Sequence, residues 1–139
     1  MFLTFNCFLK AKQIEIKDTF DLSFDFRTNA KNGILAIISD SYTNDCFFIE
    51  LYDSQLKATL YIDGEPDSCW TEFETPILSD YLWNPVNVKL VGNRLSMHCR
   101  NNFFTKHHRR YLRAPIRGDL FVAGHPGYFL NINFFIMLF

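Results

Sequence analysis

Residues 20–27 alternate apolar and polar side chains without interruption. Successive side chains of a β-strand point to opposite faces, so this alternation predicts a strand with one buried and one solvated face. No segment of the chain shows a convincing helical period of 3.6 residues. The predicted buried face carries Phe20, Leu22, Phe24 and Phe26, and the solvated face carries Asp21, Ser23 and Asp25.

Further strands are predicted along most of the chain. Alternation recurs in residues 46–52, 56–62, 86–90 and 95–99, and residues 34–38 form a short apolar run of the kind found in strands covered on both faces. Because turn signals separate such segments and helical periodicity is missing, we predict an all-β fold, an antiparallel two-sheet sandwich. The residues expected inside are Phe20, Leu22, Phe24, Phe26, Phe47, Ile49, Leu51, Leu60, Val88 and Leu120.

The connections and the remaining strands are less strongly marked. Residues 53–55 and the Gly92-Asn93 pair have hairpin length, and residues 64–67 and 101–102 are expected to be turns. Additional strands are expected in three segments, residues 1–12, 69–75 and 119–124.

The length of 139 residues predicts one domain, because a second core would need roughly 100 residues of its own. Aromatic residues make up 17% of the chain, which favours a pleated, half-buried surface. Residues 128–139 form an apolar run broken by two asparagines, well short of the ~20 residues that span a bilayer. We therefore expect no membrane insertion, and residues 1–12 lack the basic start and cleavage site of a signal peptide.

The charges are divided unevenly along the chain. Residues 1–80 carry 6 basic and 14 acidic side chains, whereas residues 81–118 carry 8 basic side chains and no acid. One edge of the domain is therefore expected to be positive although the net charge is only −1. The four cysteines show no metal-finger spacing, so a zinc framework is not expected, and the sequence leaves disulfide pairing open.

Four stretches of the sequence resemble one family. Residues 20–33 read FDLSFDFRTNAKNG and resemble F-x-[IL]-S-F-x-[FL]-R-T, followed by an apolar strand; residues 45–64 resemble the next hairpin. Trp83 with Val86 matches W-H-x-V imperfectly, and residues 120–127 match L-[YF]-V-G-G-x-P with Ala123 in place of glycine. In this order and spacing, the stretches resemble a laminin G-like domain.

The resemblance implies a jelly-roll sandwich of the concanavalin A type. It also implies an extracellular, non-enzymatic binding module, whose partners are acidic glycans, glycoprotein receptors or other matrix proteins in cell adhesion. We expect this domain to occupy residues 1–127 and to be followed by an atypical apolar tail, residues 128–139. The family's closing G-C-[IL] strand is missing there, so either the sequence is truncated or the tail replaces that strand.

Members of the family often hold one calcium ion at an edge of the sandwich. The resemblance places Asp45 at the first acidic ligand and the Ile62 carbonyl at a second ligand. The next acid or amide should lie in residues 115–118, where this chain has Arg117. Arginine opposes a divalent cation, and one alternative is that it pairs with Asp45. We therefore predict weak or no calcium binding, and Asp45 has an alternative interpretation as an ordinary loop residue.

The densest basic cluster lies near the end of the acid-free stretch. Guanidinium groups match the planar oxygens of sulfates and carboxylates, so a basic loop of this kind predicts binding of sulfated or acidic glycans. The alternative is a solvated loop with incidental charge. His107 and His108 are expected to add charge under acidic conditions. The candidate glycan-binding residues are Lys106, Arg109, Arg110, Arg113 and Arg117.

Two other functions receive little support from the sequence. A carbohydrate-active enzyme on a similar sandwich would need two carboxylates flanking a cleft, for which Glu72 and Glu74 are the nearest candidates. Solvated acids on an outer strand explain them more simply. Nucleic acid would be attracted by the basic cluster, but the sequence contains no recognised nucleic-acid module and its isoelectric point is about 6.4, so no nucleic-acid partner is expected.

Overall fold

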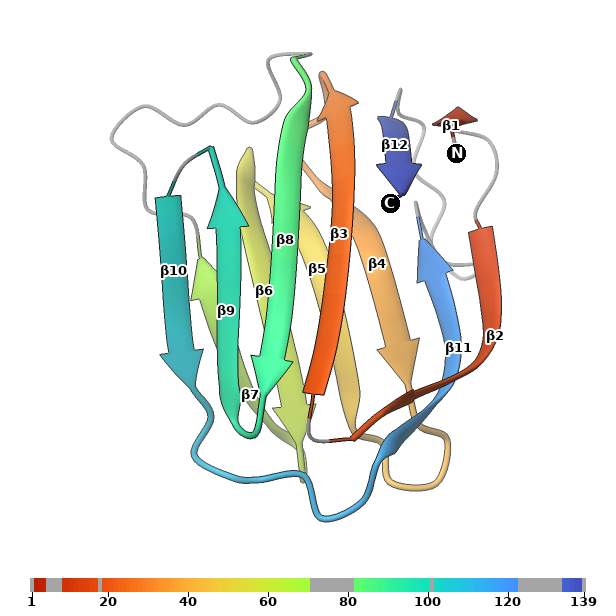
Figure 1. The fold of residues 1–139 in the computed structure, drawn as a ribbon, viewed down its shortest axis with the longest axis vertical. Coiled ribbons are helices and arrows are strands. Elements are labelled where there is room, and N and C mark those ends of the chain that lie inside the picture. Colours follow the sequence, from red (N-terminus) through yellow and green to blue (C-terminus); the bar gives the residue numbers. More distant parts are fainter. Residues whose placement is uncertain are drawn as a thin grey trace.

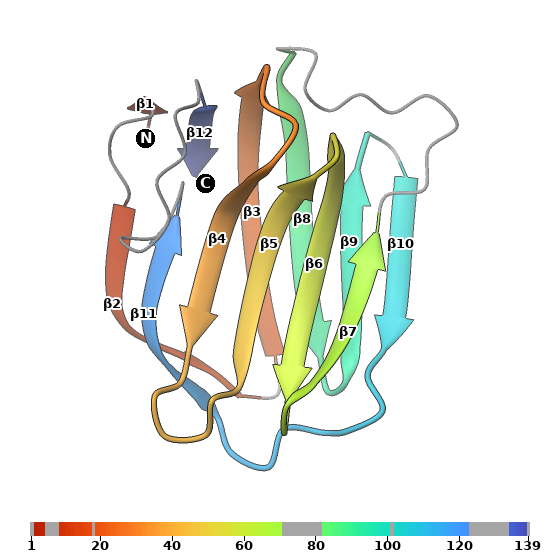
Figure 2. The ribbon, with the colours of Figure 1, turned by 180° about the vertical axis from the view of Figure 1, so that it is seen from behind.

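The computed structural model describes residues 2–4, 9–17, 19–70, 82–100, 102–122 and 134–138. It consists of two six-stranded antiparallel sheets that face each other (Figure 1; Figure 2 shows the opposite side). This arrangement confirms the predicted all-β jelly-roll sandwich of the concanavalin A type. None of the described residues forms a helix long and apolar enough to cross a membrane.

Sheet A has the strand order β1-β12-β3-β8-β9-β10, and sheet B has the order β2-β11-β4-β5-β6-β7. The strands of sheet A are β1 (Phe2–Thr4), β12 (Phe134–Leu138), β3 (Thr19–Thr28), β8 (Asn84–Val91), β9 (Arg94–Cys99) and β10 (Asn102–His107). The strands of sheet B are β2 (Leu9–Ile16), β11 (Ile116–Val122), β4 (Gly33–Ser39), β5 (Cys46–Tyr52), β6 (Gln55–Ile62) and β7 (Glu65–Trp70).

The core lies between the two sheets and is built from the alternating residues of both inner faces. Eight of the ten residues predicted to be inside are buried, and the other two, Phe20 and Leu22, are half-buried and pack against the core. Phe20 makes an edge-on contact with Phe47 of the opposite sheet, with ring centroids 5.6 Å apart. The alternation of β3 thus places its aromatic face inside, as expected.

Tight turns fix the registers of the two central hairpins of sheet B. Asp53 and Ser54 join β5 to β6, and Asp63 and Gly64 join β6 to β7; all four have positive φ. Two successive residues with positive φ are the signature of the hairpin turn whose twist matches that of the strands. The side chain of Asp45 supports the second turn, because its Oδ1 accepts the Asp63 N–H at 2.9 Å.

Several predicted boundaries were wrong. Residues 65–67 belong to β7 rather than to a turn, because the turn is completed by Asp63 and Gly64. Residues 102–107 form an edge strand of sheet A, and residues 116–118 form the start of β11. Of the predicted strand at 69–75, only residues 69–70 lie within the described residues.

Part of the predicted apolar tail belongs to the sandwich. Residues 134–138 form β12, which pairs with β3 on one side and with β1 on the other. The residues that the sequence analysis set apart as a tail therefore supply a strand to sheet A. The first predicted strand likewise consists of two strands, β1 and β2, which lie in different sheets.

Two neighbouring phenylalanines of β5 test the assignment of its inner and outer faces. Phe47 is fully buried and Phe48 is half-buried on the outer face. We expect Phe47→Ala to lower the free energy of unfolding by about 3–5 kcal/mol, and Phe48→Ala by less than about 2 kcal/mol, because only the first leaves a core cavity. Urea unfolding of the two variants measures the difference, and a larger loss for Phe48→Ala would contradict the register.

Candidate functional site

The predicted glycan-binding residues lie on one continuous segment at the end of the sandwich. Residues 106–117, here called the basic segment, run from the end of β10 to the start of β11 (Figure 1). The segment passes the turn between β6 and β7, whose residues 63–67 we call the acidic hairpin. The structure therefore brings Lys106, Arg110 and Arg113 together with three acids that lie about 40 or more positions earlier in the sequence.

His108 attaches the basic segment to both sheets. Its ring is buried, and its Nε2 donates to the Glu65 carbonyl at 2.9 Å while its Nδ1 accepts the Arg110 N–H at 2.9 Å. In this arrangement Nε2 carries a proton, and Nδ1 also lies 3.7 Å from Asp67 Oδ2. The His108 backbone also pairs with Asn93 in both directions, at 2.8 Å each. The expectation that His108 adds surface charge for a ligand is therefore wrong, because its ring is an internal anchor.

Acids of the same chain neutralise most of the predicted cations. The Arg110 guanidinium contacts Asp63 at 3.3 Å and Glu65 at 3.1 Å, and Arg113 Nε lies 3.6 Å from Asp63. Lys106 lies 3.9 Å from Asp67. These are exposed or half-exposed pairs, each worth only ~0–1 kcal/mol, so an external anion can compete for them.

Arg109 differs from its neighbours. Its backbone N–H donates to Asp67 at 3.2 Å, but its exposed side chain has no acidic partner among the described residues. The side chains of His107 and Arg94 also have no acidic partner among the described residues. These two residues are directly opposite each other in the pairing of β10 with β9. Directly paired residues project from the same face of a sheet, so Arg94 and His107 are neighbours on the outer face of sheet A.

Arg94 was not among the predicted site residues, because it lies 12 positions before the basic segment. The signal was present in its alternation: Leu95, Met97 and Cys99 are buried, so Arg94 must point outward. Strand β10, however, was not predicted, and it is the pairing of β10 with β9 that brings His107 beside Arg94.

Arg117 is directed away from the place that the resemblance assigned to it. Its guanidinium contacts Glu15 of β2 at 3.2 Å, and its backbone N–H donates to the buried Asp40 at 2.9 Å. The alternative in which Arg117 pairs with Asp45 is therefore wrong. Directly after it, Gly118 lies so close to β4 that any Cβ there would collide with the Ser39 carbonyl oxygen. Only glycine allows this approach of the two strands.

The residues near Asp45 fit a calcium ion poorly. Asp45 is buried and one of its oxygens already accepts the Asp63 N–H, while both oxygens of Asp40 accept backbone N–H groups. Ile62 is fully buried, and residues 115–118 contain a cation, Arg117, and no acid or amide side chain. Calcium takes six to eight oxygen ligands. Within the described ranges, no group of three histidine, cysteine or acidic side chains is arranged to hold a metal ion.

The remaining candidate residues are acids and cysteines, only some of which the structure describes. Glu72 and Glu74, the candidates for an enzyme, lie outside the described residues, as does Cys7. Cys46 and Cys99 carry free thiols, and burial raises the pKa of Cys99 to about 11. A thiol with so high a pKa is a poor nucleophile at neutral pH.

Comparison with known proteins agrees with this architecture. The sandwich resembles domains LG4-5 of the mouse laminin α1 chain (TM-score 0.78, 15% identity, covering 96% of this chain and 39% of that one). It also resembles the LG1-3 region of the laminin α2 chain (TM-score 0.75, 18% identity, covering 99% and 26%). A third similar structure is the heptameric SAP-like pentraxin of Limulus polyphemus (TM-score 0.66, 12% identity, covering 94% and 67%).

These likenesses define a jelly-roll sandwich. A sequence model of the laminin G domain matches residues 26–134, so the chain belongs to the laminin G domain family. Domains of this family are generally non-catalytic binding modules of extracellular proteins. The chain spans less than half the length of the two laminin chains, and no curated protein matches it.

The hydrogen bonds of Asp40 generate a prediction about pH. Three backbone N–H groups, including that of Arg117, hold the pKa of Asp40 below 3.8. The stabilisation is therefore complete above pH 3.8 and is lost as the pH falls through the lowered pKa. We expect Asp40→Asn to cost about 1.5–3 kcal/mol at pH 7 and less below pH ~4. Urea unfolding at both pH values measures this; an equal cost at both would contradict it.

Weak calcium binding stays a prediction that thermal unfolding can test. Because a ligand stabilises in proportion to the logarithm of its concentration over Kd, we expect millimolar calcium to raise Tm by no more than about 2 °C. A larger rise in the wild type that disappears in Asp45→Ala would show that the chain contains a calcium ligand we have not recognised.

Proposed function

We propose that this laminin G domain is a non-catalytic extracellular module that binds sulfated or acidic glycans at the end of the sandwich formed by the basic segment. The contacts centre on Arg94, His107 and Arg109. The observation that carries the proposal is that these three side chains have no acidic partner within the described residues, whereas the neighbouring cations do.

The rest of the basic segment supplies a second set of contacts. Arg113 is 82% exposed although it lies 3.6 Å from Asp63, and Arg110 is 42% exposed. A polyanion that first meets Arg94 and Arg109 can displace the weak pairs to Asp63 and Glu65 and recruit these arginines. Tyr111, which is 67% exposed, adds an aromatic face beside the cations.

The buried ring of His108 gives the site its rigidity. Since it holds the segment against Glu65 and Asn93, Arg109 is presented on an ordered backbone rather than on a loose loop. Ordering before binding reduces the entropy lost on association. Affinity nevertheless depends on exposed charges, so it is modest and falls as salt rises.

Retention on a heparin column tests the site. We expect Arg94→Ala/Arg109→Ala to elute at clearly lower salt than the wild type, with an affinity reduced about tenfold. Lys17→Ala/Lys31→Ala is the matched control, because it also removes two exposed positive charges but leaves the basic segment unchanged, and it should elute close to the wild type. If the double variant and the wild type elute together, the proposal fails.

A second variant, changed in the acidic hairpin, tests the role of Arg110 and Arg113 separately. Asp63→Asn/Glu65→Gln removes the competing carboxylates of Arg110 and Arg113 and should increase retention. Asp21→Asn/Asp53→Asn, which removes two exposed acids elsewhere in the chain, controls for the change in net charge. Equal retention of the hairpin variant and the wild type would show that these arginines take no part in binding.

A further inference from the structure

The outer face of sheet A carries one row of side chains that crosses four strands. In the strand pairing, Ser23 of β3 is opposite Asn87 of β8, Asn87 is opposite His98 of β9, and His98 is opposite Phe103 of β10. With strands ~4.8 Å apart, the row extends over roughly 14 Å. The row is therefore long enough to accommodate two linked sugar rings.

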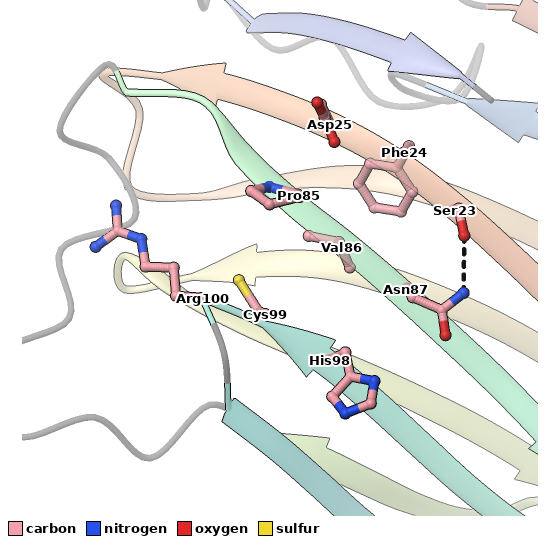
Figure 3. Close-up of a pocket in the computed structure, with 9 residues that line it drawn as sticks. All are labelled: Ser23, Phe24, Asp25, Pro85, Val86, Asn87, His98, Cys99 and Arg100. Atoms are coloured by element: carbon pink, nitrogen blue, oxygen red, sulfur yellow. Dashed lines mark hydrogen bonds between the residues drawn. The ribbon is translucent and has the colours of Figure 1, made fainter.

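A depression of about 580 Å³ lies along this row (Figure 3). Its outward-facing lining includes Ser23, Asn87 and His98, together with Asp25 and Pro85 of the adjacent row. Figure 3 shows these side chains projecting from the same three neighbouring strands. Phe103, 54% exposed, lies beside the depression, and its ring centroid is 4.7 Å from that of His98.

Hydrogen bonding orients the central amide of the row. Asn87 Nδ2 donates to Ser23 Oγ at 2.7 Å and to Asp21 Oδ1 at 2.6 Å. Its NH₂ group is thereby occupied, and its Oδ1, directed away from Ser23 in Figure 3, accepts nothing from the described residues. The amide is therefore held as a fixed acceptor at the centre of the depression.

Two further polar groups at the depression lack protein partners within the described residues. The half-buried Asp25 carboxylate accepts no hydrogen bond, and its desolvation raises its pKa above 3.8. His98 likewise has both ring nitrogens unbonded. Arg100 lines the depression too, so one carboxylate and one guanidinium balance the charge there.

The adjoining outer row on the other side, from Asp21 to Thr105, is satisfied internally and differs in this from the row of the depression. In the adjoining row, Lys89 pairs with Asp21 at 3.8 Å and Ser96 contacts Thr105 at 3.5 Å. On sheet B, Lys57 lies 3.7 Å from Glu50 and 4.4 Å from the centre of the Trp70 ring. These groups leave little unused hydrogen-bonding capacity for a ligand.

We propose that this depression is a second binding site, separate from the basic segment, and that it takes a neutral saccharide of about two rings. Vicinal hydroxyls would donate to Asp25, Asn87 Oδ1 and His98, and the C–H face of a ring would lie on Phe103. Acceptors that are fixed and beside an aromatic surface suit a ligand that is rich in hydroxyl donors and carries no charge. The balanced charge of the lining disfavours a polyanion or a polycation.

Saturation-transfer NMR on the whole chain tests this site, with lactose, maltose, cellobiose and N,N′-diacetylchitobiose as probes. We expect at least one disaccharide to receive saturation from the protein and His98→Ala to weaken its binding about fivefold, the effect of one lost hydrogen bond. Phe103→Ala is a second variant that removes the stacking surface without touching a polar group.

His107→Ala is the matched control, since it removes another exposed histidine of the same sheet face. It should leave saccharide binding unchanged while lowering heparin retention. His98→Ala, in contrast, should weaken saccharide binding and leave heparin retention unchanged. The inference is overturned if no probe is saturated at about 20 mM, a concentration that detects even weak millimolar binding. It is also overturned if both pocket variants bind like the wild type, or if a heparin tetrasaccharide displaces the disaccharide.

Discussion

The antiparallel pairing of β3 with β8 is the constraint on which most of this structure depends. The register that buries Phe24 and Val86 between the sheets also places Ser23 and Asn87 side by side on the outer face. A shift by one residue would exchange the two sets of side chains and expose the core. Stability and the outer surface of sheet A are therefore set by the same hydrogen-bond ladder.

The long connection from sheet A to sheet B is the second feature that the structure has to hold in place. The basic segment must connect β10 to β11 at one end of the sandwich, and it does so along the acidic hairpin. The weak ion pairs contribute little to stability. The buried His108 ring and the Asn93 pairing hold the segment instead, which leaves the surface charges available for a ligand.

The sequence predicted the strands well where one face is buried, because burial of one face imposes a two-residue alternation of apolar and polar side chains. The alternation of β3, β5 and β8 predicted their inner faces, because an exposed Phe24 or Ile49 would be costly. The edge strand β10 was missed because almost all its residues are exposed, so backbone pairing with β9 holds it and no apolar pattern marks it. Similarly, Pro115 and Gly118 are residue types that are typical of loops, so the start of β11 was not recognised. In the structure Gly118 lies within β11, where only glycine allows the close approach to Ser39.

The candidate site was predictable only in part, for a related reason. A local run of charge identified Arg109 and its neighbours, but the carboxylates that pair with Arg110 lie 45 and 47 positions away, and nothing in the local sequence reveals them. The position of Arg94 beside His107 likewise depends on the pairing of β9 with β10. Which cations remain available to a ligand is thus a property of the tertiary structure.

The most direct test of the account is a map of backbone amide shifts during titration with a heparin tetrasaccharide. The account predicts that the shifts centre on Arg94, His107 and Arg109, spread to Arg110 and Arg113, and leave Asn87 and His98 unchanged. Shifts centred on the row from Ser23 to Phe103 would contradict the assignment of the acidic-glycan site to this end of the sandwich.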